Sequence, residues 1–388
     1  MKVENHTPFP SVAWENADAS RCQHLTCLTR VKYRLQPPPD YYSSYWSLRL
    51  TPDQGELFGG DQYYGDDITR PVRYESDFIT YKSRTDIVLN AIAHSPDGTP
   101  KMHWNCGIKV LTPSGKILKH LILNVRGARQ WVKMPIGWAK SPLEAVKRVR
   151  LSYDKAQGGS LYDPRKEEEE IPTYLAYNAI NPSGTGIRHR KMLPNSFPVH
   201  QVEWATPQLT PKSYPPGFGF INRAWPIRTG YAGTYDQQWL DNQHPYPPKD
   251  FNVFHHQAAN PELILDRHIE VNSRFELENL LPRAPRVSFH LPELHCFVET
   301  TDKQGNQSRT RMKIDTVLID IESDQSEDWA VYVSYRHYQV INDPIQALNF
   351  KYLPVEWINR SKTKPPRTEQ SQTEQSQKAA LQEISYGR

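Results

Sequence analysis

The sequence lacks an apolar run long enough to cross a membrane as a helix, and it has only four cysteines in 388 residues. No two of these cysteines form a Cys-x-x-Cys pair, so their spacing predicts no zinc site. The start, Met1 to His6, is polar and is followed by prolines, unlike a secretory signal. We therefore expect a cytoplasmic protein with reduced cysteines and no membrane insertion.

Long segments with apolar residues at helical spacing are also missing, and the 33 prolines outnumber the 19 glycines. Proline favours loops, turns and edge strands over helix interiors. Aromatic residues reach 11%, enough to place the chain among globular rather than disordered proteins. The 47 basic and 43 acidic residues nearly balance, so the composition indicates no nucleic-acid partner.

The motifs of several enzyme classes are missing as well. There is no Gly-x-Ser-x-Gly elbow and no Walker loop, and Gly184-Thr-Gly186 lacks the third glycine of a dinucleotide-binding turn. A group of histidines and an aspartate invites a metal hypothesis, but none of their spacings matches a helical ligand pair: His244, Asp250, His255, His256 and His268. We expect no metal, no cofactor and no assignable catalytic residue.

What the sequence does contain is a series of strand-like runs bounded by turn residues. The predicted strands cover residues 27–35, 86–93, 105–111, 116–125, 146–153, 287–291, 295–301, 310–321 and 329–338. Ser95-Pro-Asp-Gly98 and Thr112-Pro-Ser-Gly115 are typical of tight turns. This pattern predicts a mainly β fold, with antiparallel strands in sandwich-like sheets and long loops rich in proline, glycine and aromatic residues.

Composition divides the chain into four regions. Residues 1–155 are rich in predicted strands, and residues 156–216 form a long irregular connection. Residues 217–358 contain an aromatic loop followed by an antiparallel meander. Residues 361–388 are rich in Gln, Ser, Thr and Lys, which predicts a disordered tail. Whether the two strand-rich regions are copies of one unit stays open, because they do not align convincingly.

The most distinctive stretch is the loop formed by Gly217–Trp225 and Gly233–Trp239, which is dense in glycine and aromatic rings. Glycine lets the backbone approach a ring closely, and tryptophan provides apolar area that a loop cannot otherwise bury. A long ordered loop usually carries function or braces it. The candidates for partner binding or for bracing the loop are Arg223, Trp225, Arg228, Tyr235, Asp236 and Trp239.

A second cluster consists of carboxylates. Asp66, Glu75 and Asp77 could carry out acid–base chemistry in a hydrolase. The interpretation that we favour is a structural network of ion pairs and hydrogen bonds, because such networks are common. Its expected members are Glu75, Asp77, Lys82, Arg84 and Asp86. The hydrolase predicts a carboxylate of strongly raised pKa in a cleft, whereas the network predicts paired carboxylates.

Several short motifs, taken in their order along the chain, resemble the bacterial domain-of-unknown-function family 2169. The resemblance runs from the N-terminus to about Tyr338. Its motifs are Asn5-His-Thr-Pro-Phe9, Tyr63-Tyr-Gly-Asp66, Glu75-Ser-Asp77, Gly127-Ala-Arg-Gln-Trp131, Gly217-Phe-Gly219, Gly233-Thr-Tyr-Asp236, Pro248-Lys-Asp-Phe251 and Asp315-Thr-Val317.

The resemblance implies a function that the residues alone do not reveal. Members of this family are typically encoded beside type VI secretion spike genes of the PAAR and VgrG kinds, and are thought to act as cytosolic adaptors or chaperones. The resemblance therefore implies a non-enzymatic adaptor that binds a secretion effector or its PAAR-type carrier and assists loading onto the VgrG spike. Two alternatives stay open: the hydrolase above, and a structural component that travels with the spike.

Overall fold

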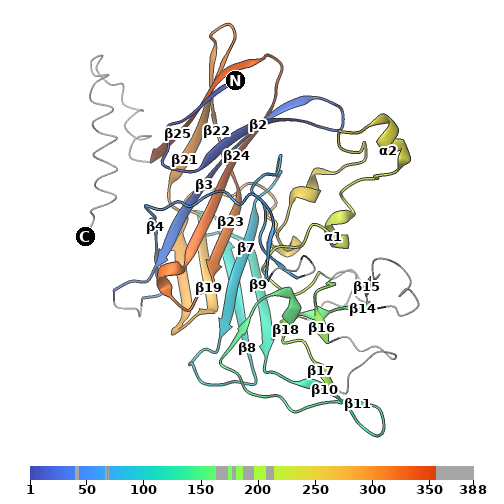
Figure 1. The fold of residues 1–388 in the computed structure, drawn as a ribbon. Coiled ribbons are helices and arrows are strands. Elements are labelled where there is room, and N and C mark those ends of the chain that lie inside the picture. The colour runs from blue at the N-terminus through green and yellow to red at the C-terminus, as the bar shows by residue number, and fades with distance from the viewer. Residues whose placement is uncertain are drawn as a thin grey trace.

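The computed structural model describes residues 1–39, 43–65, 68, 70–162, 174–176, 181–186, 196–206 and 214–354. These residues form sheets of mostly antiparallel strands with a few short helices (Figure 1). The predicted mainly β fold with sandwich-like sheets is therefore confirmed. Asp66 and the expected tail, residues 361–388, lie outside the described residues.

The largest sheet contains seven strands, in the order β12-β7-β23-β24-β3-β2, with β4 paired to β3. The pair β7–β23 is parallel, and the other pairs of this sheet are antiparallel. The predicted strands at 27–35, 86–93 and 329–338 are confirmed as members of it. The bounds are β2 (Ser11–Ala17), β3 (Gln23–Gln36), β4 (Ser47–Leu50), β7 (Asp86–His94), β12 (Arg148–Arg150), β23 (Lys313–Ile321) and β24 (Ala330–Val340).

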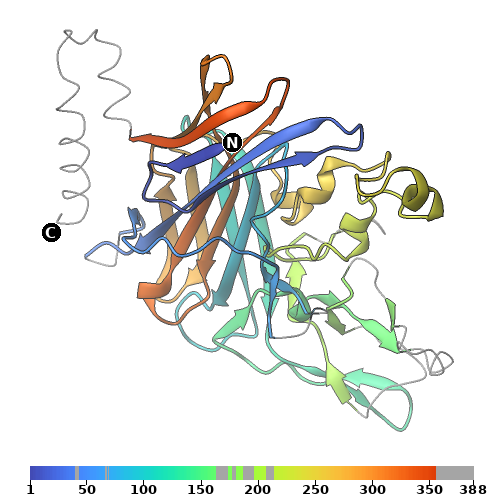
Figure 2. The ribbon, with the colours of Figure 1, turned by 45° about the horizontal axis from the view of Figure 1, so that its top comes forward.

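A five-stranded sheet, in the order β18-β9-β8-β19-β20, lies behind the first one (Figures 1 and 2). Its β8–β9 hairpin confirms the predicted strands at 105–111 and 116–125 and the turn between them. The Trp46 amide donates a hydrogen bond to the Ser288 carbonyl (2.8 Å), which ties the two sheets together at one edge. The bounds are β8 (His103–Leu111), β9 (Ile117–Arg126), β18 (Val202–Trp204), β19 (Arg274–Leu281) and β20 (Ala284–His290).

One continuous apolar core joins both of these sheets to a third, four-stranded sheet. Buried side chains from all three sheets belong to it, for example Leu89, Phe275 and Phe350. The third sheet has the order β1-β25-β21-β22, and its bounds are β1 (Lys2–Asn5), β21 (Leu294–Asp302), β22 (Gln307–Arg311) and β25 (Ile345–Pro354). Strands from both ends of the chain thus share sheets.

The structure corrects the strand expected over residues 310–321. The chain turns a corner at Met312, so that β22 lies in the four-stranded sheet and β23 in the seven-stranded sheet. Met312 is buried, and its amide donates a hydrogen bond to the Cys296 carbonyl (2.9 Å). The alternating pattern continues through the corner, which is why the sequence reads as one strand. A meander would keep consecutive strands in one sheet, whereas the pairs β19–β20, β21–β22 and β23–β24 lie in three sheets.

The remaining elements are short. The strand expected over 146–153 is reduced to β12. Tyr153 instead begins the 3-10 helix η1, and its side chain is buried. Six short strands, β13 to β18, lie in the described part of the 156–216 connection. Small sheets use β5 (Gln62–Tyr63), β6 (Val72–Tyr74), β10 (Gln130–Lys133), β11 (Trp138–Lys140), β13 (Gln157–Gly158), β14 (Ser160–Tyr162), β15 (Tyr174–Ala176), β16 (Thr185–Gly186) and β17 (Ser196–Pro198).

Within the described ranges, the helices are η1 (Tyr153–Lys155), α1 (Pro226–Thr229), α2 (Gln237–Asn242), η3 (Val253–His256), η4 (Pro261–Leu263) and η5 (Ser326–Asp328). Helix α2 projects to one side of the sheets, at the outer end of the yellow segment in Figures 1 and 2. In the part of the chain that the structure describes, no helix has the length and apolar character needed to span a membrane.

Candidate functional site

The carboxylate cluster is centred on the ammonium group of Lys82. Its Nζ lies 2.6 Å from Asp86 Oδ2, 3.7 Å from Glu75 Oε2 and 3.1 Å from Thr316 Oγ1. Asp86 begins β7, and its carboxylate also accepts hydrogen bonds from the Gln257 side chain and the Ala258 amide (both 2.7 Å). Burial alone would lower the pKa of Lys82, but the Asp86 and Glu75 carboxylates outweigh burial and raise this pKa.

Arg228, from the aromatic loop, completes the pairing of Glu75. Its Nη2 lies 2.7 Å from Glu75 Oε1, and both residues are almost fully buried. The remaining donors of the guanidinium bind backbone carbonyls: Nε and Nη2 bind His255 O (3.0 and 2.8 Å), and Nη1 binds Ile221 O (2.9 Å). The two groups of residues singled out from the sequence therefore meet at the Glu75–Arg228 pair.

Asp77 is held by cations from the large sheet. Arg30 Nη1 lies 2.5 Å from Asp77 Oδ2, which also accepts a hydrogen bond from the Phe58 amide (2.7 Å). Burial raises the pKa of the Asp77 carboxyl, and Arg30 partly offsets this effect. Arg336 donates to the carbonyls of Asp77 (3.1 Å) and Ile79 (2.7 Å) and pairs with the buried Asp315.

Sequence reasoning missed three members of this network: Arg30, Asp315 and Arg336. Arg30 lies in a predicted strand, and the sequence near it does not show which face of that strand is buried against other segments. Asp315 appeared only in a motif of the resemblance. Arg84, an expected member, has a different place: its guanidinium lies over the Phe254 ring, 4.9 Å from the ring centroid, and its amide donates to Gln257 (3.2 Å).

The space beside these carboxylates is very small. The cavity bordered by Glu75, Asp77 and Lys82 has a volume of about 20 Å³. A cavity of this size holds about one water molecule, of ~10–15 Å³ by this measure. It has no room for an organic substrate in the described conformation. Asp66, the third carboxylate of the hydrolase hypothesis, lies outside the described residues.

The base of the aromatic loop is fixed to the body of the protein. Arg223 forms a bidentate ion pair with Asp61, in which Nε contacts Oδ2 and Nη2 contacts Oδ1, each at 2.6 Å. Trp225 is only 4% exposed, and its ring packs edge-on against Tyr153 at a centroid distance of 5.5 Å. Together with Arg228, these two residues connect the loop to the sheets.

The outer part of the loop is exposed. Asp236 caps α2 by accepting a hydrogen bond from the Trp239 amide (2.8 Å). Tyr235 packs edge-on against Trp239 (4.7 Å), and Trp239 Nε1 donates to the Tyr246 carbonyl (3.0 Å). Large apolar side chains remain exposed here: Tyr231 (40%), Tyr235 (58%) and Leu240 (52%). We call these three residues the exposed tip.

The histidines of the metal hypothesis make other contacts. His255 and His256 lie in η3, where His255 Nδ1 is 3.0 Å from the Arg228 carbonyl and His256 Nε2 is 3.0 Å from Thr80 Oγ1. Burial lowers the pKa of His256 to about 3. Among the described residues, no three His, Cys, Asp or Glu side chains lie close enough together to hold a metal ion.

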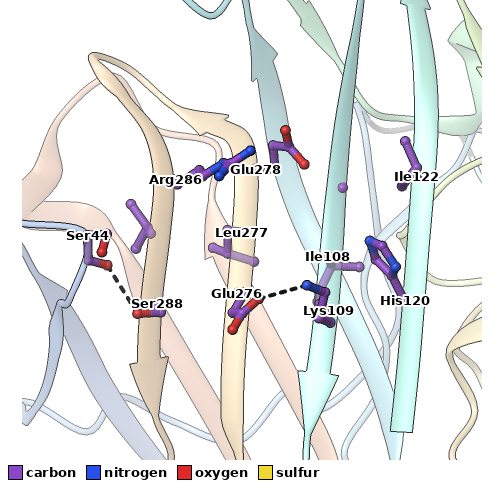
Figure 3. Close-up of a pocket in the computed structure, with 12 residues that line it drawn as sticks. Ser44, Ile108, Lys109, His120, Ile122, Glu276, Leu277, Glu278, Arg286 and Ser288 are labelled. Carbon is purple, nitrogen blue, oxygen red and sulfur yellow. Dashed lines mark hydrogen bonds and ion pairs between the residues drawn. The ribbon is translucent and has the colours of Figure 1, made fainter. Parts of the chain in front are cut away.

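A larger pocket, of about 380 Å³, lies on the outer face of the five-stranded sheet (Figure 3). Gly107 is among the residues that line this pocket, and a Cβ there would lie 2.7 Å from the Leu121 carbonyl oxygen of the neighbouring strand. Charges of opposite sign line this pocket: Lys109 Nζ lies 3.1 Å from Glu276 Oε2, and Arg286 stands opposite Glu278 in the strand register. The pocket therefore has no marked preference for ligands of one charge.

Comparison with known proteins identifies a family but no characterised relative. Residues 20–329 match the family described as "Uncharacterized protein conserved in bacteria (DUF2169)". The comparisons with curated proteins and with solved structures found no match. The matched residues include every described residue of the carboxylate network except Arg336, and the whole aromatic loop. The chain belongs to this bacterial DUF2169 family.

Proposed function

We propose that this protein is a cytosolic adaptor that binds a type VI secretion effector, or the PAAR-type protein that carries it, and assists its loading onto the VgrG spike. The observation that carries the proposal is the division of the aromatic loop into a fixed base and an exposed tip. Arg223, Trp225 and Arg228 anchor the base. Tyr235 and Leu240 leave apolar area at the tip accessible to a partner.

This division matches the physical requirements of protein capture. Aromatic anchors dominate the binding energy of many interfaces, and a surface that is already ordered loses less conformational entropy on binding. Arg21 donates a hydrogen bond to the Asn242 carbonyl (2.8 Å), which holds the end of α2 before a partner arrives. The Asp236 cap orders the start of α2. A preformed, exposed surface of this kind suits an adaptor better than it suits an enzyme.

The carboxylate cluster gives less support to the hydrolase alternative. Glu75 and Asp77 are both paired with buried cations, and the cavity beside them holds about one water molecule. Both observations favour a network that stabilises the fold over a site that accepts a substrate. The adaptor is therefore the better-supported of the two hypotheses.

The test is a pull-down from the native bacterium with tagged wild-type protein and the double variant Tyr235→Ala/Leu240→Ala, followed by mass spectrometry. We expect the wild type to recover a PAAR-bearing or toxin-bearing protein and the variant to lose most of it. The unfolding midpoint of the variant should match that of the wild type, since neither side chain is buried. Ile117→Ala serves as the control, because Ile117 is 54% exposed but lies on β9, in the sheet behind.

Three results would count against the proposal in different ways. No PAAR- or toxin-bearing protein among the captured proteins would contradict the adaptor function itself. Equal capture by wild type and Tyr235→Ala/Leu240→Ala would keep the adaptor but reject the exposed tip as its surface. Recovery of the tagged protein from the culture supernatant would favour a component that travels with the spike.

A further inference from the structure

A second large pocket, of about 410 Å³, lies where β22, β23 and β24 meet, on the outer side of the Met312 corner. Its volume falls within the roughly 300–1,000 Å³ that is usual for small-molecule sites. Four cationic side chains line it: Arg311 from β22, Lys313 from β23, Arg336 from β24, and Lys82 from the loop before β7. Of the residues that the structure describes, no Asp or Glu lines this pocket.

The alternation of side chains through the corner explains why two cations face the same pocket. Side chains alternate between the two faces of a strand. Met312 is buried in the core, whereas Arg311 and Lys313 on either side of it are exposed. The change of sheet at Met312 interrupts the hydrogen-bonded ladder between strands but not the alternation of side chains. The guanidinium of Arg311 and the ammonium of Lys313 therefore both lie at the pocket wall.

The inner wall of the pocket is electrically compensated. Lys82 is paired with Asp86 and Glu75, and Arg336 is paired with Asp315. Arg311 and Lys313, in contrast, have no ion-pair partner among the described residues. The pocket on the five-stranded sheet has similar volume but places a carboxylate opposite each cation. Of these two pockets, the one at the corner therefore carries two positive charges without an ion-pair partner among the described residues.

The histidines of the pocket do not change this balance near neutral pH. Burial lowers the pKa of His268 and of His337, and Lys313 lowers both further. Nearby, the His268 Nδ1 also lies 3.2 Å from the Ile314 carbonyl oxygen. The neighbouring wall is aromatic: Tyr81 and Tyr338 are stacked with their ring centroids 4.9 Å apart. The pocket thus combines two free cations with a partly apolar wall.

We propose that this pocket binds a small organic phosphate, with the phosphate group between Arg311 and Lys313 and the organic part toward Tyr81 and Tyr338. A phosphate monoester carries a charge close to −2 near neutral pH, and this charge matches the two free cations. Arginine also suits phosphate because its fork of N–H donors can form two parallel hydrogen bonds, while lysine adds a point charge. A single carboxylate would leave one cation uncompensated.

The experiment is isothermal titration calorimetry of the full chain in a phosphate-free buffer at low salt. The probes are phenyl phosphate, inorganic phosphate and benzenesulfonate, which has the same ring but one negative charge. We expect phenyl phosphate to bind most tightly. Arg311→Gln/Lys313→Gln should weaken its binding by roughly tenfold or more, because charge-assisted hydrogen bonds are lost. Arg49→Gln/Lys303→Gln removes the same charges from exposed positions outside the pocket and should leave binding unchanged.

The outcomes separate the parts of the proposal. Equal affinity of wild type and Arg311→Gln/Lys313→Gln for phenyl phosphate would overturn it, as would the absence of binding by any probe. Equal affinity for phenyl phosphate and benzenesulfonate would show that the second negative charge of the phosphate is not recognised by Arg311 and Lys313, and would reject that part of the proposal. Circular dichroism and thermal unfolding of each variant show whether it is folded, and both substituted side chains are exposed. None of these results depends on the adaptor function.

Discussion

At the scale of single residues, the most consequential feature is the buried ammonium of Lys82. Burying a charge is costly unless it is paired and hydrogen-bonded. Lys82 meets this condition through Asp86 at the start of β7, Glu75 directly after β6, and Thr316 in β23. The same contacts that compensate the charge also fix the positions of three separate segments.

Lys82→Met should therefore be strongly destabilising. The methionine fills similar space but leaves Asp86 and Glu75 without their shared cation. We expect a loss of about 3–5 kcal/mol in the free energy of unfolding, the range for breaking one side of a buried ion pair. Urea unfolding followed by circular dichroism measures it.

The matched control for this substitution is Lys2→Met. Lys2 Nζ lies 2.6 Å from Glu4 Oε1, as close as the Lys82–Asp86 contact, but the pair is exposed to solvent. Exposed ion pairs contribute little to stability. We expect no measurable change for this variant. A Lys82→Met protein as stable as the wild type would show that the network is not a stabilising one.

At the scale of elements, the aromatic loop is positioned by close packing against η1. Gly217 lies so near to Tyr153 that a Cβ would be 2.6 Å from the ring. Two residues on, a Cβ at Gly219 would be 3.7 Å from the other side of the same ring, an ordinary contact. The Tyr153 hydroxyl also donates to the Gly219 carbonyl (3.0 Å). The ring of Tyr153 therefore sets the path of the loop.

This geometry predicts opposite effects for two similar substitutions. Gly217→Ala should lower the free energy of unfolding by about 1–3 kcal/mol, because the buried ring has to shift. Gly219→Ala should cause no loss, and the reduced freedom of the unfolded chain favours a small gain. Urea unfolding of the two variants side by side provides the measurement. Equal destabilisation by both would mean that Tyr153 does not constrain the loop.

At the scale of the whole molecule, the three larger sheets share one apolar core, and each contributes one buried cysteine to it. Cys27 lies in β3, Cys106 in β8 and Cys296 in β21, while Cys22 is exposed. Burial raises the pKa of the Cys27 thiol to about 12 and raises the pKa of Cys106 and Cys296 as well. The thiolate is the reactive form, so these three thiols should be inert in the folded protein.

We therefore expect one of the four cysteines to react with an aromatic disulfide reagent at pH 8 in the folded protein. With increasing urea, the three buried cysteines should become reactive together, at the midpoint observed by circular dichroism. Mass spectrometry of the labelled peptides identifies which cysteine has reacted. Labelling of Cys296 at a lower urea concentration than Cys27 and Cys106 would show that the four-stranded sheet unfolds separately.

The parts of the fold that could be predicted from the sequence are those that depend on neighbours along the chain. The strands β3, β7 and β24 and the β8–β9 hairpin were predicted because alternation, apolar runs and turn residues are local signals. The break at Met312 was missed because the alternation runs through it. Local patterns also identified Glu75, Lys82 and Asp86 as a group and the aromatic loop as a distinctive segment.

Tertiary contacts alone settle how these pieces come together. Arg30 and Arg228 are distant in the sequence from Asp77 and Glu75, the carboxylates that they bind. The pairing of β3, β23 and β24 brings Arg30, Asp315 and Arg336 into one layer, where Arg336 binds Asp315. The change of sheet between β22 and β23 places Arg311 and Lys313 beside Tyr81 and Tyr338, and neither cation has an ion-pair partner among the described residues. Local residue patterns determine which side chains share a face of a strand. Which charges meet on that face depends on strand order, because hydrogen-bonded ladders join segments regardless of their separation along the chain.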